Sequence, residues 1–175
     1  MRQQRQKAFT LIELMVVLLI MGVLTAAALP SFRQTLISNR ISSTASDFVV
    51  DLTVARATAT TRGVRVGICA SSNQSTCTGS WEQGWMMYLD ANNNNAFDAG
   101  ETIVRVRYAI DSLAPAQGGM SLVPTVAATN IYFRPSGPAD AAHTFNICKS
   151  GFTGRKIDVT AVGRVSSVPT AAVCP

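Results

Sequence analysis

The sequence predicts an α+β fold: a long N-terminal helix, membrane-spanning in its first half, packed on an antiparallel β-sheet. Three observations predict this fold. An apolar run covers residues 9–29, and apolar or small residues then recur three and four positions apart up to about Thr60, as in an amphipathic helix. Afterwards, short β-branched or aromatic runs alternate with Gly, Asn, Pro and Ser, which is typical of strands and turns. The length of 175 residues suits one anchor and one small domain.

The apolar run of residues 9–29 is long enough to cross a membrane. At 1.5 Å per residue, its length corresponds to roughly 31 Å of helix, which matches the hydrocarbon core of a bilayer. The run contains one acidic residue, Glu13. A carboxylate inside such a segment costs roughly 2.5–3.5 kcal/mol on insertion scales. Glu13 is therefore a candidate functional residue.

A basic leader, residues 1–8, precedes the apolar run. An ordinary signal peptide is cut after its apolar stretch, but here the break between polar and apolar sequence falls before it, at Ala8–Phe9. The positive leader predicts that the N-terminus stays in the cytoplasm and that most of the chain lies outside. The formal net charge is +5, but a chain without this leader keeps 12 basic and 10 acidic side chains. The basic composition is therefore a weak argument for general binding to polyanions.

Residues 8–14, with the sequence A-F-T-L-I-E-L, resemble the class III leader of type IV pilins and type II secretion pseudopilins. The resemblance implies that a prepilin peptidase cuts between Ala8 and Phe9 and methylates the new amine. The family usually has Gly where this chain has Ala8, which predicts slower cleavage. Glu13 would become the fifth residue of the mature chain and meet the cationic N-terminus of a neighbouring subunit, since a buried carboxylate needs a partner. The alternative is a plain membrane anchor with Glu13 in the headgroup region.

Residues 30–62 are expected to continue the helix as an amphipathic segment. Pro30 is expected to end or kink the apolar helix because it lacks a backbone donor. The pair Arg62–Gly63 is expected to close the helix, since Gly suits a C-terminal cap. The side chains expected to be buried are Leu36, Ile37, Ile41, Ala45, Phe48, Leu52, Ala55 and Ala59.

Residues 63–175 are expected to form a β-rich periplasmic domain. Strands are predicted over residues 64–69, 84–90, 102–109, 130–134, 144–148 and 155–160. The run 84–90 is apolar on both faces, which predicts a central strand. Residues 84–106 resemble the hairpin, and residues 145–165 the C-terminal strands, of the FimT/FimU/GspH group of minor pilins and pseudopilins. The resemblance implies a pilin-like fold.

All four cysteines lie beyond the apolar run, and an even number in an exported domain favours disulfides. Four cysteines allow three pairings. Cys69 and Cys77 bracket a turn rich in Ser, Asn and Thr, which suits a local bridge, and Cys148–Cys174 would then tie the tail to a strand. Zinc is disfavoured because the chain has no C-x-x-C pair and His143 is its single histidine.

The loop between residues 90 and 101 resembles a calcium-binding loop in its spacing. The oxygen-bearing residues at positions 1, 3, 5, 9 and 12 of an EF-hand-like pattern are Asp90, Asn92, Asn94, Asp98 and Glu101. Two features argue against calcium: position 6 is Asn95 rather than Gly, and the flanks are predicted strands rather than helices. The alternative is an Asx-rich hairpin turn that needs no ion. No other cofactor is expected.

Basic residues gather near the C-terminus, which suggests contact with DNA. The candidates are Lys149, Arg155, Lys156 and Arg164. Such a patch would bind the phosphates of extracellular DNA weakly and with a strong dependence on salt. DNA-binding members of the group carry G-R-x-R in the tail, whereas this chain has Ser166 in the second arginine place. The alternative is that these are ordinary solvated charges.

The sequence contains no catalytic constellation, and we expect no enzymatic activity. The resemblance implies a minor type IV pilin that primes or caps pilus assembly and supports twitching, adhesion or DNA uptake. The alternatives are a GspH-like pseudopilin of a type II secretion system and a DNA receptor for transformation. The expected partners are major and minor pilins, the inner-membrane assembly machinery and prepilin peptidase. The expected location is the inner membrane, by a single pass, and then a surface pilus or a periplasmic pseudopilus.

Overall fold

The computed structural model describes residues 9–170 and divides the chain into two compact units, which meet between Ile37 and Ser38. The helix α1 (Leu11–Arg62) belongs to both units and does not end at Pro30. Gly63 follows α1 with a left-handed φ of 64°, which confirms the predicted glycine cap.

The rest of the described chain is built from eight strands and two short 3₁₀ helices. Their bounds are β1 (Arg65–Ala70), η1 (Trp81–Gln83), β2 (Gly84–Asp90), β3 (Ile103–Tyr108), η2 (Pro115–Gln117), β4 (Ser121–Pro124), β5 (Asn130–Phe133), β6 (His143–Cys148), β7 (Gly154–Val159) and β8 (Val165–Thr170).

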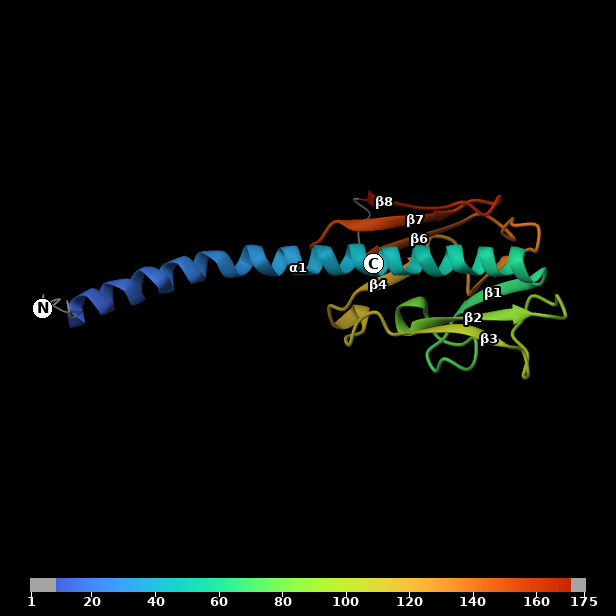
Figure 1. Cartoon of the computed structure of the whole chain (residues 1–175), viewed down its shortest axis with the longest axis horizontal. Coiled ribbons are helices and arrows are strands. Elements are labelled where there is room, and N and C mark those ends of the chain that lie inside the picture. The colour runs from blue at the N-terminus through green and yellow to red at the C-terminus, as the bar shows by residue number, and fades with distance from the viewer. Residues whose placement is uncertain (1–8, 171–175) are drawn as a thin grey trace, which may run out of the picture. The chain divides into compact units, whose positions relative to one another are not determined.

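The strands are antiparallel, as predicted, but they divide into two four-stranded sheets rather than one. Sheet A has the order β3-β2-β1-β5 and sheet B the order β4-β6-β7-β8. In Figure 1, β6, β7 and β8 lie on one side of the second half of α1, and β1, β2 and β3 lie on the other. The run predicted to be a central strand is β2, which lies between β3 and β1 with nearly all its residues buried.

The second half of α1 provides the core that both sheets share. The ring of Phe48 makes edge contacts with Trp85 of β2 and Phe145 of β6, with ring centroids 5.0 and 5.1 Å apart. Six predicted core positions are confirmed as fully buried: Ile41, Ala45, Phe48, Leu52, Ala55 and Ala59. The prediction was wrong for Leu36, which precedes the second unit and is 53% exposed.

Six of the eight strands lie within a residue or two of their predicted positions. The sequence analysis missed β4, with the sequence SLVP, and β8, with the sequence VSSVPT. Each contains a proline and at least one serine, and these residues are typical of turns. Both are edge strands of sheet B, where proline is tolerated because one side of the backbone has no partner strand.

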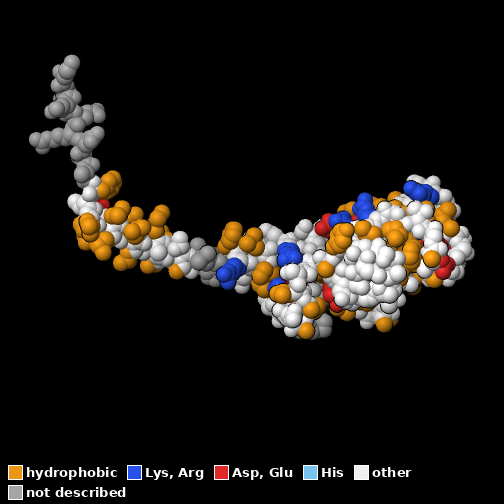
Figure 2. Space-filling model, turned by 90° about the horizontal axis from the view of Figure 1, so that it is seen from below, with side chains coloured by type: hydrophobic (Ala, Val, Ile, Leu, Met, Phe, Trp, Pro, Cys, Tyr) orange, Lys and Arg blue, Asp and Glu red, His pale blue; other side chains and the backbone are white. Residues whose placement is uncertain are grey.

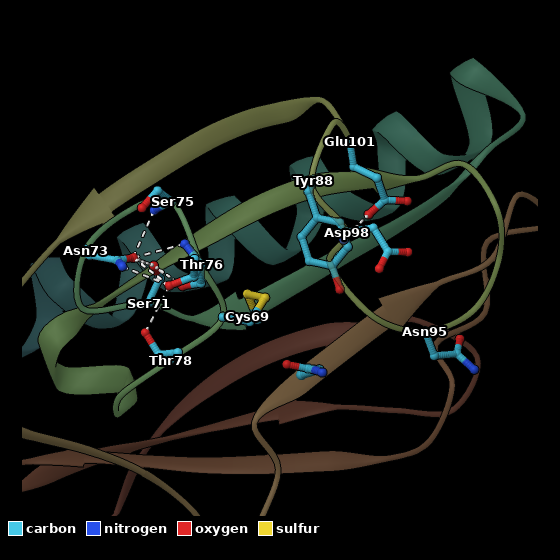
Figure 3. The surroundings of a disulfide bond; sticks show 12 residues. Cys69, Ser71, Asn73, Ser75, Thr76, Thr78, Tyr88, Asn95, Asp98 and Glu101 are labelled. Atoms are coloured by element: carbon cyan, nitrogen blue, oxygen red, sulfur yellow. Dashed lines mark hydrogen bonds between the residues drawn. A yellow bond between two sulfur atoms is a disulfide. The ribbon is translucent and has the colours of Figure 1, made fainter.

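The predicted disulfide between Cys69 and Cys77 is confirmed. Cys69 belongs to a buried cluster with Met86, Tyr88 and Tyr132, and Cys77 packs against this cluster. Figure 3 shows the disulfide between Tyr88 and the loop that carries Asn73. The disulfide therefore fastens a loop over the face of sheet A that points away from α1.

Replacing both cysteines of this bridge, Cys69 and Cys77, by serine is expected to lower stability by about 2.5 kcal/mol, because the closed loop restricts the unfolded chain. The two residues are eight positions apart in the chain. Thermal unfolding of the full-length protein in detergent would measure the change. An unchanged Tm would contradict a stabilising role for the bridge.

The turn between β7 and β8 packs tightly onto the end of α1. The Nε of Arg56 donates a hydrogen bond of 2.9 Å to the carbonyl oxygen of Gly137. A methyl group added at Gly163 would lie 2.3 Å from that same oxygen and 2.9 Å from the Arg56 Nε. Gly163 also has a φ of 81°, which disfavours other residues. The site therefore requires glycine for both space and backbone conformation.

Gly163→Ala is expected to destabilise the protein by about 2 kcal/mol, since it adds a steric clash to the cost of the left-handed backbone. Gly151→Ala is the matched control, because Gly151 has a φ of 83° but nothing within 4 Å of the added carbon. Chemical denaturation of the two variants would isolate the clash. Equal losses in both variants would show that the contact with Gly137 contributes nothing.

Candidate functional site

The first half of α1 presents apolar side chains to its surroundings on all sides. Every described side chain from residue 9 to residue 26 is exposed, and Leu11 and Leu19 are 76% and 69% exposed. Figure 2 shows hydrophobic side chains along the visible face of this part of the helix. By length and composition, α1 can cross a membrane. Such a surface requires either lipid or other helices around it.

The start of α1 is capped by Thr10, next to the candidate Glu13. The backbone N–H of Glu13 donates to the Thr10 Oγ1 at 3.3 Å, and the N–H of Leu14 donates to the Thr10 carbonyl at 3.2 Å. Thr10 is thus the N-cap, and Glu13 places an acid in the first turn, where it complements the helix dipole. The candidate cleavage residue Ala8 lies outside the described residues, whereas Phe9 is described and is 80% exposed.

A buried carboxylate, Asp51, connects the second half of α1 to the edge strand β3. Its Oδ1 accepts a hydrogen bond of 2.7 Å from Arg105, and its Oδ2 accepts one of 2.7 Å from Arg107 and one of 3.0 Å from the Trp85 Nε1. Burial by itself would raise the pKa of Asp51, but the hydrogen bonds from Arg107, Arg105 and Trp85 outweigh it and lower the pKa. The carboxylate therefore stays ionised and holds two arginines against the helix.

The loop proposed for calcium forms a hydrogen-bonded turn. The side-chain amides of Asn92 and Asn94 donate to the Asp98 Oδ2 at 2.7 and 2.6 Å. The Oε1 of Glu101 accepts from the N–H of Ala91, and Asp90 accepts from the N–H groups of residues 94 and 95. The five candidate ligands are thus brought into one loop, in which each makes hydrogen bonds.

Arg65 supplies a positive charge to the same loop. Its Nη1 lies 3.8 Å from the Asp90 Oδ2, donates to the Asn93 carbonyl at 3.1 Å and also bonds the Asn95 side chain. Asn93 and Asn95 have left-handed φ values of 59° and 62°, which asparagine tolerates. Calcium binding remains a prediction.

The four basic residues proposed to contact DNA do not lie together. Lys149 is ion-paired with Asp111 at 3.7 Å, and Arg155 donates from its Nε to the Ser167 Oγ at 3.0 Å. Adjacent residues of a strand point to opposite faces, so Arg155 and Lys156 face opposite sides of sheet B. Only Lys156 and Arg164 line the same depression.

This depression has a volume of about 530 Å³, and Thr144, Thr160 and Ser166 line it beside the two basic residues. Asp158 also lines it and lies 2.9 Å from the Lys156 Nζ, which reduces the local positive charge. The surface is therefore smaller and less positive than the spacing of the basic residues suggested.

The second predicted disulfide involves Cys174, which lies outside the described residues. Cys148 is buried at the end of β6, where the Cα of Gly154 on β7 packs close to it. Gly154 pairs with Thr170, the last described residue. The Cys148–Cys174 pairing remains a prediction.

The comparisons with known proteins agree with this arrangement. The family model described as "Type II transport protein GspH" matches residues 44–163, which is more than half of the chain. The chain belongs to the GspH family. In addition, a prokaryotic N-terminal methylation motif matches residues 3–29 of this GspH-family chain. No curated protein matches the chain in sequence.

Two solved structures of the type IV minor pilin FimU from Pseudomonas aeruginosa share the fold of this GspH-family protein. One has a TM-score of 0.58 at 19% identity, with 78% of this chain and 94% of FimU covered. The other, a second crystal form, has a TM-score of 0.54 at 19% identity, and the match covers 76% of this chain and 96% of that FimU chain. The minor pseudopilin EpsH of the Vibrio cholerae type 2 secretion system has a TM-score of 0.48 at 12% identity, with 76% and 99% covered.

The sequence analysis missed two features of this GspH-family protein. The cap at Thr10 has a sequence signal, since threonine followed three residues later by Glu13 is a capping-box pattern. The contacts of Asp51 with Arg105 and Arg107 join residues 54 and 56 positions apart. The signal for these contacts is an acid inside a predicted apolar stripe and two arginines on alternate positions of a predicted strand.

Proposed function

We propose that this GspH-family chain is a minor type IV pilin whose role is filament assembly. A prepilin peptidase would remove residues 1–8 and methylate the amine of Phe9. The mature helix, residues 9–29, would hold the subunit in the inner membrane with the domain, residues 63–175, in the periplasm. The subunit would then enter a filament with other pilins. The GspH-like pseudopilin of a type II secretion system is the second candidate.

The main support for this proposal is the difference between the two parts of α1. Its first part is apolar and exposed on all sides, whereas one face of its second part is buried against two sheets. A soluble domain would not gain from such an exposed apolar extension, but a filament buries it by packing helices together. The methylation motif over residues 3–29 supports the same function.

Complementation of a deletion strain would test the proposal. The intact mass of the recovered chain should correspond to loss of residues 1–8 and gain of one methyl group. Restored surface pili would support the pilin role, and restored protein secretion without pili would support the pseudopilin. A chain that keeps residues 1–8 and still restores function would contradict the processing step.

DNA uptake is a further candidate role, and one observation favours it. Lys156 and Arg164 line the same depression, so a phosphate there would meet two cations. The ion pair of Lys156 with Asp158 limits the expected affinity. The DNA contact proposed here is therefore weak and confined to these two residues.

The Lys156→Gln/Arg164→Gln variant is expected to lose DNA binding at low salt. With two phosphate contacts, the logarithm of the wild-type binding constant should fall with that of the salt concentration with a slope of about −1.8. Arg155→Gln, on the opposite face, is the matched control and should bind as the wild type does. Fluorescence anisotropy with labelled duplex DNA would measure all three. Equal binding by the double variant would exclude this site.

A further inference from the structure

We propose that the open edge of β3 binds an extended segment of another filament subunit, one that alternates acidic and apolar side chains. The identity of the partner as a filament subunit rests on the proposed function. The mode of binding, addition of a strand to sheet A, rests on the edge itself.

The strand β3 is six residues long and forms one edge of sheet A. Within the described residues β3 pairs only with β2, and Figure 1 shows it at the margin of sheet A. A strand with unpaired backbone groups is a template for pairing with another chain. The edge is therefore available for strand addition, the mode by which many domains bind extended peptides.

The backbone groups of Val106 and Tyr108 point to the open side. The backbone N–H of Leu89 in β2 donates a hydrogen bond to the carbonyl of Thr102, just before β3. Backbone groups alternate in direction along a strand, so the N–H and C=O groups of the other odd-numbered residues of β2 also point toward β3. Arg105 and Arg107 pair with odd-numbered residues of β2, so their backbone groups face β2. The alternate residues between and after them, Val106 and Tyr108, therefore offer their N–H and C=O groups to a partner.

The other described sheet edges carry features that oppose strand addition. The outer side of β5 is covered, since the N–H of Asp140 donates to the Tyr132 carbonyl and Phe133 bridges to Ala139. Edge strands β4 and β8 contain Pro124 and Pro169, which lack a donor. Among these four edges, β3 has neither a covering segment nor a proline.

The side chains beside this edge indicate what the added strand would carry. A pocket of about 470 Å³ lies beside it on the α1 side, lined by Thr44 and Asp47 of α1 and by Trp85 and Arg107 of sheet A. It would receive the side chains of the added strand that face α1. On the opposite face of β3, Tyr108 is 73% exposed, which suits an apolar neighbour.

Charge distinguishes a foreign strand from a second copy of β3. The side chains of Arg105 and Arg107 are 41% and 36% exposed, whereas the Asp51 beneath them is 1% exposed. Asp47 of α1 is 52% exposed and lies 3.7 Å from Arg107, so it offsets part of this charge, and a neighbouring strand still meets both guanidinium groups. β3 itself carries no acidic residue. Two β3 strands side by side would place arginines against arginines, which is unfavourable. An acidic strand would instead pair with them.

Binding of a probe peptide to the full-length protein in detergent micelles would test this inference. The probe is a short labelled peptide of alternating valine and glutamate, and its control alternates valine and lysine. We expect the glutamate peptide to bind at least about tenfold more tightly, because like charges across an interface are strongly disfavoured. Amide hydrogen exchange should slow at Val106 and Tyr108 when the peptide is bound.

Two variants separate the backbone contact from the side-chain contact. Tyr108→Pro removes the outward backbone N–H, whereas Tyr108→Ala keeps it. The proline variant should therefore bind the glutamate peptide about tenfold more weakly than the alanine variant does. Equal binding of both peptides, unchanged exchange at saturation, or protection of the same amides by self-association without peptide would each overturn the proposal. None of these outcomes bears on leader removal or restored pili, which test the proposed function separately.

Discussion

Replacing Glu13 by alanine is expected to leave leader removal intact and to abolish filament assembly. In the proposed filament, the Glu13 carboxylate is buried among helices and meets the cationic N-terminus of a neighbouring subunit. Loss of such a pair costs well over 1.4 kcal/mol, so the amount of assembled subunit should fall by at least about tenfold. Immunoblots of sheared pili and of membrane fractions would measure assembled and unassembled protein.

Glu13→Gln separates the charge of this residue from its place in the first turn of α1. Glutamine suits the third helical position after the Thr10 cap, but it carries no charge. We therefore expect Glu13→Gln to fail in assembly as Glu13→Ala does. Normal assembly by the glutamine variant would assign Glu13 a local role in the helix, and normal assembly by both variants would favour a plain membrane anchor.

Replacing Asp51 by alanine is expected to destabilise the domain by about 3 kcal/mol, which lowers Tm by roughly 6–12 °C. The variant leaves the Trp85 indole N–H without its acceptor and leaves two arginines without their shared carboxylate. The arginines are partly exposed and can turn toward water. The expected loss of stability is therefore at the lower end of the range for breaking a buried ion pair. Thermal unfolding would measure it, and a change within about 0.5 kcal/mol would contradict the role of Asp51.

Asp51→Asn gives this contact a pH test. The pKa of Asp51 is lower in the folded protein than in the unfolded chain, so its contribution is fully present above the unfolded pKa of about 3.9 and disappears as the pH falls through the folded value. Below about pH 4 the wild type should therefore lose stability faster than Asp51→Asn. Parallel pH dependence of the two proteins would exclude a special contribution from this carboxylate.

The helix and most strands could be predicted because their signals are local. The three-and-four spacing that includes Ile41, Phe48 and Leu52 defines one buried stripe, and these side chains are fully buried. The turn between Cys69 and Cys77 likewise indicated its own bridge. In each case neighbouring residues in the chain carry the physical cause of the structure.

The features that could not be predicted depend on contacts between residues far apart in the sequence. The two sheets share a core in which Phe48 contacts both Trp85 and Phe145, and no local pattern in the sequence shows that these distant residues meet. The basic residues near the C-terminus also depend on distant contacts, since Lys149 forms an ion pair with Asp111 and Arg155 donates a hydrogen bond to Ser167. Charge counted along the sequence therefore overstated the charge available on one surface.

The side-chain bonds along α1 have a mechanical consequence for a subunit held by its N-terminal helix. Tension on α1 would reach the domain partly through side-chain bonds at three positions of the helix: Arg40 to the Ile110 carbonyl, Asp51 to β3, and Arg56 to Gly137. Each joins the helix to a different segment of the domain. Because forced unfolding depends on the rate of unfolding, these connections would set how long a stretched subunit keeps its fold.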